Sequence, residues 1–200
     1  MDNPLYALRD AMAAARFPRE RFNHHANSGA LDRLFAFLGE DMEAHAPTRR
    51  GGAGTGRGSG RAISADATLV VAIAARLLLR NVDPDTAFRI GGVFVFLGEM
   101  GQGLRSIAPA GMAAMRPAGG LFPADLGDTF LAVLPTALHT PGGQGYAFVP
   151  ERDLTADNLA AWSAENDADG QSLILVNLSQ VVAQVRAALE AVEAESLASV

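Results

Sequence analysis

Between two helical patterns the chain reads Pro47-Thr-Arg-Arg-Gly-Gly-Ala-Gly-Thr-Gly-Arg-Gly-Ser-Gly-Arg61. This Arg/Gly segment contains no acidic residue, and its arginines are Arg49, Arg50, Arg57 and Arg61. Because glycine loses more backbone entropy on ordering than any other residue, we expect the segment to be mobile on its own. Guanidinium groups on such a loop gain most from an anionic partner, and nucleic-acid phosphate is the obvious candidate. The alternative interpretation is a solvated linker between two helical units.

The residues before the Arg/Gly segment predict three helices. Residues 4–15 combine an early proline with strong helix formers, which predicts the first helix. Pro18 begins the second, and Asn27-Ser-Gly29 predicts a turn with an N-cap. The third helix has an apolar face made of Leu31, Leu34, Phe35 and Leu38.

The residues after the Arg/Gly segment begin helical and then change period. Ser64 is a natural N-cap for a helix over 65–80, and Asp83-Pro84 predicts the start of another over 85–97. Further on we expect strands over 129–134, 146–149 and 172–176, and helices over 155–165 and 179–195. The sequence therefore predicts a mostly α fold with a small α+β C-terminal part.

Composition and charge suggest a protein of two parts. The 200 residues are 49% hydrophobic and 19% charged, as in ordinary soluble domains, and the net charge is −6. Residues 1–116 contain 14 arginines and 11 acidic residues (net +3), whereas residues 117–200 contain two arginines and 11 acidic residues (net −9). We expect a helical front domain over 1–98, an irregular linker over 99–120 and a small α+β domain over 121–200.

A helix, a tight turn, a helix, a basic loop and a further helix make the plan of a winged helix-turn-helix. Residues 17–80 resemble the N-terminal DNA-binding domain of MerR-like regulators, in a degenerate form. The matching pieces are Phe17-Pro-Arg-Glu-Arg-Phe22 for the first helix, Asn27-Ser-Gly-Ala-Leu-Asp-Arg-Leu34 for the turn and recognition helix, 47–62 for the flexible wing, and Arg61-Ala-Ile-Ser-Ala-Asp66 for the strand that closes the wing. The sequence departs from the family at Ile63, where an aromatic residue is usual, and its recognition helix lacks the expected tryptophan.

The candidate DNA-contacting residues lie on the two short helices and on the wing. They are Arg19, Arg21, Ser28, Arg33, Arg49, Arg50, Arg57 and Arg61. Arg33 is the only long donor on the presumed recognition helix and suits a guanine edge or a phosphate. Ser28 offers a hydroxyl or a helix N-terminus to phosphate. Arg19 and Arg21 either clamp the DNA backbone or are solvated surface charges that have no such role.

The chain has no arrangement typical of an enzyme or of a metal site. There is no cysteine, and no serine lies in a nucleophile elbow. The pair His24-His25 makes a poor chelate, because neighbouring side chains on a helix diverge by about 100°. We therefore expect no catalytic residue, no metal and no cofactor.

The function that we predict is binding to double-stranded DNA, as a bacterial transcriptional regulator or a phage-type DNA-recognition factor. Helix-turn-helix proteins commonly read two half-sites, so we expect a homodimer. The back domain would serve oligomerisation or the sensing of an unknown small-molecule effector. The apolar runs are too short to span a bilayer, and we expect a cytoplasmic protein with no membrane partner. The alternative is a protein-interaction or structural module in which the Arg/Gly segment is only a linker.

Overall fold

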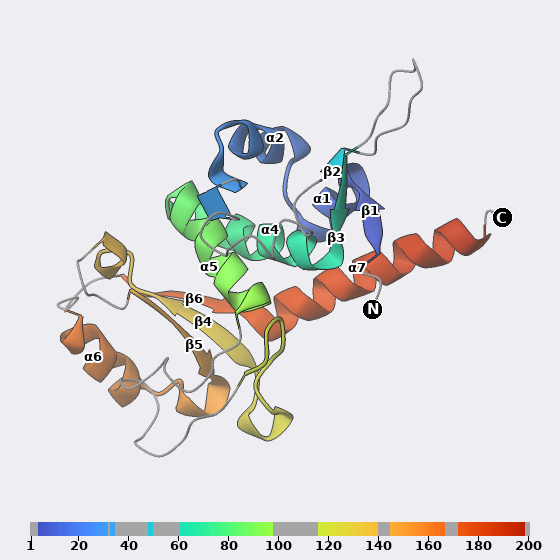
Figure 1. Ribbon diagram of the computed structural model, residues 1–200. Helices are drawn as coiled ribbons and strands as arrows, with labels where there is room; N and C mark the ends of the chain where they lie inside the picture. The colour runs from blue at the N-terminus through green and yellow to red at the C-terminus, as the bar shows by residue number, and fades with distance from the viewer. Residues whose placement is uncertain are drawn as a thin grey trace. The chain divides into compact units, whose positions relative to one another are not determined.

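The computed structural model describes residues 4–31, 33–34, 48–49, 61–97, 116–139, 145–166 and 172–198. The chain forms two compact units: unit 1 comprises Met1–Val95 and Val181–Val200, and unit 2 comprises Phe96–Gln180. The described residues are mostly helical and include two small antiparallel sheets (Figure 1). The expected mostly α fold is therefore confirmed. Most of the expected linker over 99–120 lies outside the described residues, which resume at Arg116.

Unit 1 combines helices with a three-stranded sheet in the order β1-β3-β2. Its elements are β1 (Leu5–Ala7), α1 (Leu8–Ala15), α2 (Arg19–Asn27), β2 (Thr48–Arg49), β3 (Arg61–Ser64), α4 (Ala65–Leu78), α5 (Pro84–Phe96, up to Val95) and α7 (Leu178–Ala198, from Val181). A further helical segment begins at Ala30 and is described at residues 30–31 and 33–34; we call it the Ala30 helix.

The centre of unit 1 is α4, which is buried along nearly its whole length. A helix that is apolar on all sides belongs in a core rather than at a surface. Side chains at its middle, such as Ile73 and Ala74, have no exposed area. On α5, Gly91 lies so close to α4 that an added Cβ would stand 2.8 Å from the Val70 carbonyl oxygen.

The first expected helix is shorter than predicted, because residues 5–7 form strand β1 instead. Leu5 pairs with Ser64 and Ala7 with Ala62, so β1 lies antiparallel to β3. The backbone groups of residues 5–7 thus find partners in β3, a strand far along the chain. The residues from Leu8 to Ala15 are helical as predicted.

The C-terminal helix was expected to belong to the back domain, but from Val181 onward it belongs to unit 1. Its buried stripe contains Val182, Val185 and Leu189. Polar contacts add to this packing. Gln184 Nε2 donates to the Ala14 carbonyl oxygen at 3.3 Å, and the Tyr6 hydroxyl donates to Glu193 Oε1 at 2.5 Å.

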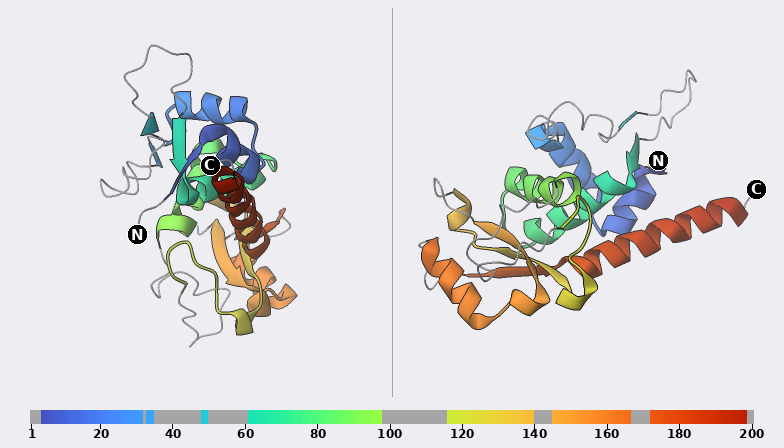
Figure 2. Two further views of the ribbon diagram at one scale, coloured as in Figure 1. Left: turned by 90° about the vertical axis from the view of Figure 1, so that its right-hand side faces the viewer. Right: turned by 60° about the horizontal axis from the view of Figure 1, so that its bottom comes forward.

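Unit 2 is built around a second three-stranded antiparallel sheet, in the order β5-β4-β6. Its elements are the short 3-10 helices η2 (Ala124–Leu126), η3 (Ala137–His139) and η4 (Glu151–Asp153), the strands β4 (Thr129–Val133), β5 (Tyr146–Pro150) and β6 (Ile174–Asn177), and the helix α6 (Ala156–Glu165). Strand β6 leads directly into α7 (Figure 2). The predicted strands and helices of this part are all present, and none of their ends is shifted by more than three residues.

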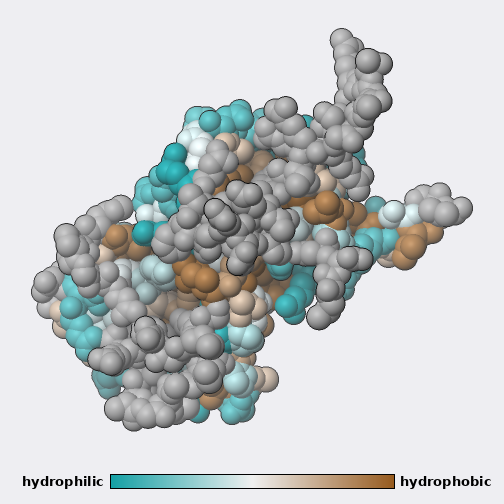
Figure 3. Space-filling model, in the orientation of Figure 1, coloured by the Kyte–Doolittle hydropathy of each residue, from teal (hydrophilic) through white to brown (hydrophobic). Residues whose placement is uncertain are grey.

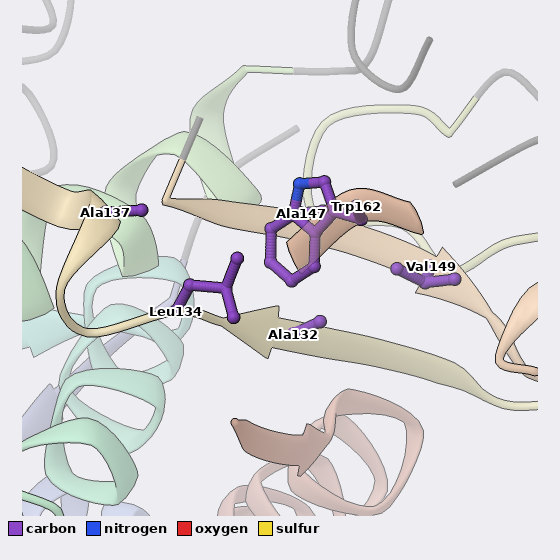
Figure 4. Packing of buried hydrophobic residues seen from close by; sticks show 6 residues of the cluster. All are labelled: Ala132, Leu134, Ala137, Ala147, Val149 and Trp162. Carbon is purple, nitrogen blue, oxygen red and sulfur yellow. The ribbon is translucent and has the colours of Figure 1, made fainter. Parts of the chain in front are cut away.

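The core of unit 2 forms where α6 packs on the sheet. Trp162 of α6 has no exposed area and lies against small side chains of β4 and β5, among them Ala132, Ala147 and Val149 (Figure 4). Leu134 and Ala137 extend the same cluster. Small residues on the strands leave room for the indole ring, so that one large side chain fills most of this layer.

Candidate nucleic-acid interface

Helix α2 presents a charged outer side and a single buried aromatic residue. It begins after Pro18, whose extended backbone ends the α1–α2 connection. Phe22 has no exposed area, whereas Arg19 and Arg21 are exposed. The outward surface of α2 is hydrophilic (Figure 3). The structure thus places both predicted arginines where an external partner can reach them.

The connection from α2 to the Ala30 helix is a two-residue turn. Ser28 and Gly29 form it, and Gly29 adopts a positive φ of 80°, a conformation that favours glycine. The Ser28 and Gly29 amides donate to the carbonyl oxygens of His24 and Ala26 at 3.0 and 3.2 Å. This confirms the predicted tight turn between two helices.

Ser28 closes the turn between the two helices. It is the C-cap of α2, and its hydroxyl donates to the His25 carbonyl oxygen at 2.8 Å. The same turn also precedes the N-terminus of the Ala30 helix, where the Arg33 amide donates to the Gly29 carbonyl oxygen at 3.0 Å. Ser28 is thus not the first residue of the second helix, which begins at Ala30, and its hydroxyl helps to close the turn; that it offers a hydroxyl or a helix N-terminus to phosphate stays a prediction.

Arg33 is held by a carboxylate rather than projecting alone. Its Nε and Nη2 atoms donate to Asp85 Oδ2 and Oδ1 at 2.8 and 2.7 Å, and Nη1 donates to the Ser28 carbonyl oxygen at 3.1 Å. Both side chains are about half exposed. The Arg33 guanidinium therefore joins the Ala30 helix to the first turn of α5, through Asp85, and to the turn after α2, through Ser28. To read a base edge, Arg33 would first have to leave Asp85.

Helix α2 and the Ala30 helix pack on a shared apolar surface. The side chains that line one small apolar cavity there are Phe22, Leu31, Leu34, Ile63, Ala67, Val70 and Val71. They come from α2, the Ala30 helix, β3 and α4. Burial of these side chains holds α2 and the Ala30 helix in place, and the Arg33–Asp85 ion pair adds to it, whereas Arg19 and Arg21 are exposed and form no part of this contact.

The Arg/Gly segment runs between two paired strands. Thr48 pairs with Ala62, and Arg49 pairs with Arg61, in an antiparallel register. The two ends of the segment are thus neighbours, and β1 completes the sheet on the other side of β3. Arg50 and Arg57 lie outside the described residues, as do the side chains of Arg49 and Arg61.

His25 lies between aromatic rings on the inner side of α2. Its ring stacks on Phe17 at 6.2 Å between centroids and meets Phe88 of α5 edge-on at 5.8 Å. Burial lowers the pKa of His25 below its ordinary value, and the charges of His24 and Arg21 lower it further. His25 is therefore a packing residue. Within the part of the chain that the structure describes, no three metal-ligating side chains gather into a possible metal site.

Sequence reasoning missed Asp85 as the partner of Arg33. The two residues are 52 positions apart, and no spacing rule links them. A signal was available only in part: Asp85 follows Pro84 in the first turn of a helix, where an acidic residue is favoured. Which arginine it would meet depends on how α5 packs, which is a tertiary property.

Comparison with models of known protein families and with curated proteins finds no match for this sequence. The functional argument therefore rests on the geometry of the described residues. None of the helices they form is long and apolar enough to cross a membrane.

Proposed function

We propose that this protein binds double-stranded DNA through a winged helix-turn-helix in unit 1. The observation that carries the proposal is the order and pairing of elements: two short helices joined by a tight turn, then paired strands β2 and β3 that enclose the Arg/Gly segment, then α4. In helix-turn-helix proteins the second helix enters the major groove and the first crosses the backbone. In this proposal the Ala30 helix enters the major groove, and α2 crosses the DNA backbone with Arg19 and Arg21.

The pairing of β2 with β3 favours a wing over a linker. A linker between independent units gains nothing from having its ends hydrogen-bonded to each other, whereas a wing needs them together. In this arrangement the wing arginines track the phosphate backbone and supply affinity without sequence preference. Arg33 contributes by fixing the turn through Asp85.

The biological role that fits this proposal is a bacterial transcriptional regulator or a phage-type DNA-recognition factor, acting as a homodimer on two half-sites. Unit 2 then serves oligomerisation or the sensing of an effector.

The test replaces residues 50–60 by Asn-Gly, a two-residue turn that suits an antiparallel hairpin. The replacement keeps β2 and β3 and removes Arg50 and Arg57. Binding to duplex DNA is measured by fluorescence anisotropy at several salt concentrations. We expect the slope of log affinity against log salt to become shallower by about two, since each phosphate contact contributes about 0.9.

The matched control removes two exposed arginines elsewhere, Arg152→Gln with Arg186→Gln, and so makes the same change in net charge. Its salt slope should equal that of the unmodified protein. An unchanged slope in the turn replacement would reject the wing. If the unmodified protein binds no duplex at low salt, the DNA-binding proposal fails and the protein-interaction module replaces it.

A further inference from the structure

A second group of arginines lies in unit 1, outside the proposed DNA-contacting set. Arg76, in the last turn of α4, reaches toward α1 and α7. Its Nη1 donates to the Ala15 carbonyl oxygen at 3.4 Å, and its Nη2 donates to Gln184 Oε1 at 3.2 Å. Gln184 is itself fixed, because its Nε2 donates to the Ala14 carbonyl oxygen at 3.3 Å. The Arg76 guanidinium is therefore held in place by neutral acceptors.

Arg16 and Arg80 lie beside this fixed group. Arg16 directly follows Ala15 and is the C-cap of α1, with a φ of 53° that turns the chain away from the helix. Arg80 Nη1 donates to the carbonyl oxygen of Arg76 at 3.1 Å. Arg16 and Arg80 are exposed, whereas Arg76 is partly buried. The cluster thus has a fixed base and two guanidinium groups open to solvent.

The charge of the cluster is not balanced within the described part of unit 1. No carboxylate there forms an ion pair with Arg16, Arg76 or Arg80. Burial lowers the pKa of Arg76, and the nearby charges of Arg16 and Arg80 lower it further. The C-termini of α1 and α4 offset only part of this charge, since each carries about half a negative charge. About two positive charges are left over.

We propose that Arg16, Arg76 and Arg80 form a binding site for a small ligand that carries a phosphate group. A phosphate oxyanion carries close to two negative charges at neutral pH and accepts several hydrogen bonds, which matches the excess charge and the donors of the cluster. Arg76 is the preorganised base, and Arg16 and Arg80 close on the ligand from the exposed side. This site does not depend on DNA binding, and it assigns the protein a class of ligand, namely small molecules that carry a phosphate group.

The experiment follows thermal unfolding of the full chain with inorganic phosphate or pyrophosphate, at an ionic strength held constant with sodium chloride. A ligand that binds only the folded state raises the unfolding temperature with concentration. We expect pyrophosphate to stabilise the protein more than chloride does. In the variant with Arg16→Gln and Arg80→Gln, half-maximal stabilisation should need at least a tenfold higher concentration. The control with Arg152→Gln and Arg186→Gln should respond like the unmodified protein.

A phosphate response equal to that of chloride would overturn the site, and so would an unchanged response of the Arg16/Arg80 variant. A second arm distinguishes a free ligand from the phosphates of DNA. The salt slope of duplex binding should be the same in this variant as in the unmodified protein. If the slope instead falls by about two while free phosphate has no effect, the cluster contacts DNA and the small-ligand site is rejected. Because the first arm contains no DNA, its result does not depend on the DNA-binding proposal.

Discussion

At Arg33, two hydrogen bonds to Asp85 compete with any bond to nucleic acid. We expect Asp85→Asn to weaken DNA binding on all duplexes alike, because the Ala30 helix loses the fork that anchors it. Electrostatics alone predicts the opposite sign, since removing an acidic residue favours a polyanion. Anisotropy titrations with preferred and random duplexes distinguish the two effects.

The matched control for Asp85→Asn is Asp10→Asn, which breaks the exposed Arg9–Asp10 pair. It makes the same change in net charge, so its effect on affinity measures the electrostatic contribution without loss of the Arg33–Asp85 pair. An Asp85→Asn variant that binds its preferred duplex more tightly would instead make Arg33 a base-reading residue. A double-mutant cycle on Arg33 and Asp85 should give a coupling of only about 0.3–1 kcal/mol, because both side chains are half exposed.

His25 makes the stability of unit 1 depend on pH. Its pKa is lowered in the folded protein, so the unfolded chain binds a proton more readily as the pH falls below about 6.5. The stabilisation that neutral His25 gives the folded protein is therefore fully present above that pH, and it is lost as the pH falls through the lowered pKa of His25 in the folded protein. We expect His25→Phe, which keeps an aromatic ring between Phe17 and Phe88, to lose less stability between pH 7.5 and 5.

Urea unfolding at each pH measures this difference. Since burial is the largest cause of the shift, His24→Gln should retain most of the pH dependence of the unmodified protein. Parallel pH profiles for the unmodified and His25→Phe proteins would contradict the assignment.

At the scale of elements, the contact between α4 and α5 depends on Gly91. Alanine favours a helix over glycine by about 1 kcal/mol, so a free position would gain from Gly91→Ala. Here the new Cβ would meet the Val70 carbonyl oxygen at 2.8 Å and Val70 Cγ1 at 3.3 Å. We expect a net loss of about 1–3 kcal/mol from overpacking, measured by urea unfolding. A variant as stable as the unmodified protein would show that α5 shifts freely.

Local signals predicted most helix starts. Ser64 and Asp83 each accept a hydrogen bond from the backbone N–H three residues later, at 3.1 and 3.0 Å, as their sequence positions indicated, and Thr155 does the same at 3.2 Å. A cap needs only neighbouring residues, so a single sequence is enough to find it.

Long-range partners were not predictable in the same way. The residues of β1 are strand only because β3 is there to pair with them, and Arg33 is fixed only because α5 brings Asp85 close. The apolar residues Val182, Val185 and Leu189 recur at helical spacing, but this periodicity carries no information about which unit the helix packs in. The candidate site was therefore predicted in its order and only partly in its contacts.

At the scale of the molecule, unit 1 is made from two separate lengths of chain. We expect a fragment of residues 1–98 to be much less stable than unit 1 in the full chain, since it lacks the buried Val181, Val182, Val185 and Leu189. Circular dichroism of the fragment should show reduced helix content and poor cooperativity. Adding a peptide of residues 178–198 should restore both.

A peptide of the same length in which Val182, Val185 and Leu189 are replaced by serine is the control, and it should restore nothing. A fragment that unfolds cooperatively without any peptide would show that α7 is dispensable for unit 1.

The divided path of unit 1 also sets the order of events during synthesis. Residues up to Val95 leave the ribosome first, yet the helix that completes their core is encoded after the whole of unit 2. At about 5–20 residues per second, the intervening stretch takes several seconds to translate. Throughout that interval the apolar surface of α4 and α1 is not yet covered by α7, and exposed apolar surface makes a nascent chain prone to aggregation. Unit 2, which is continuous, is free to fold before unit 1 is finished.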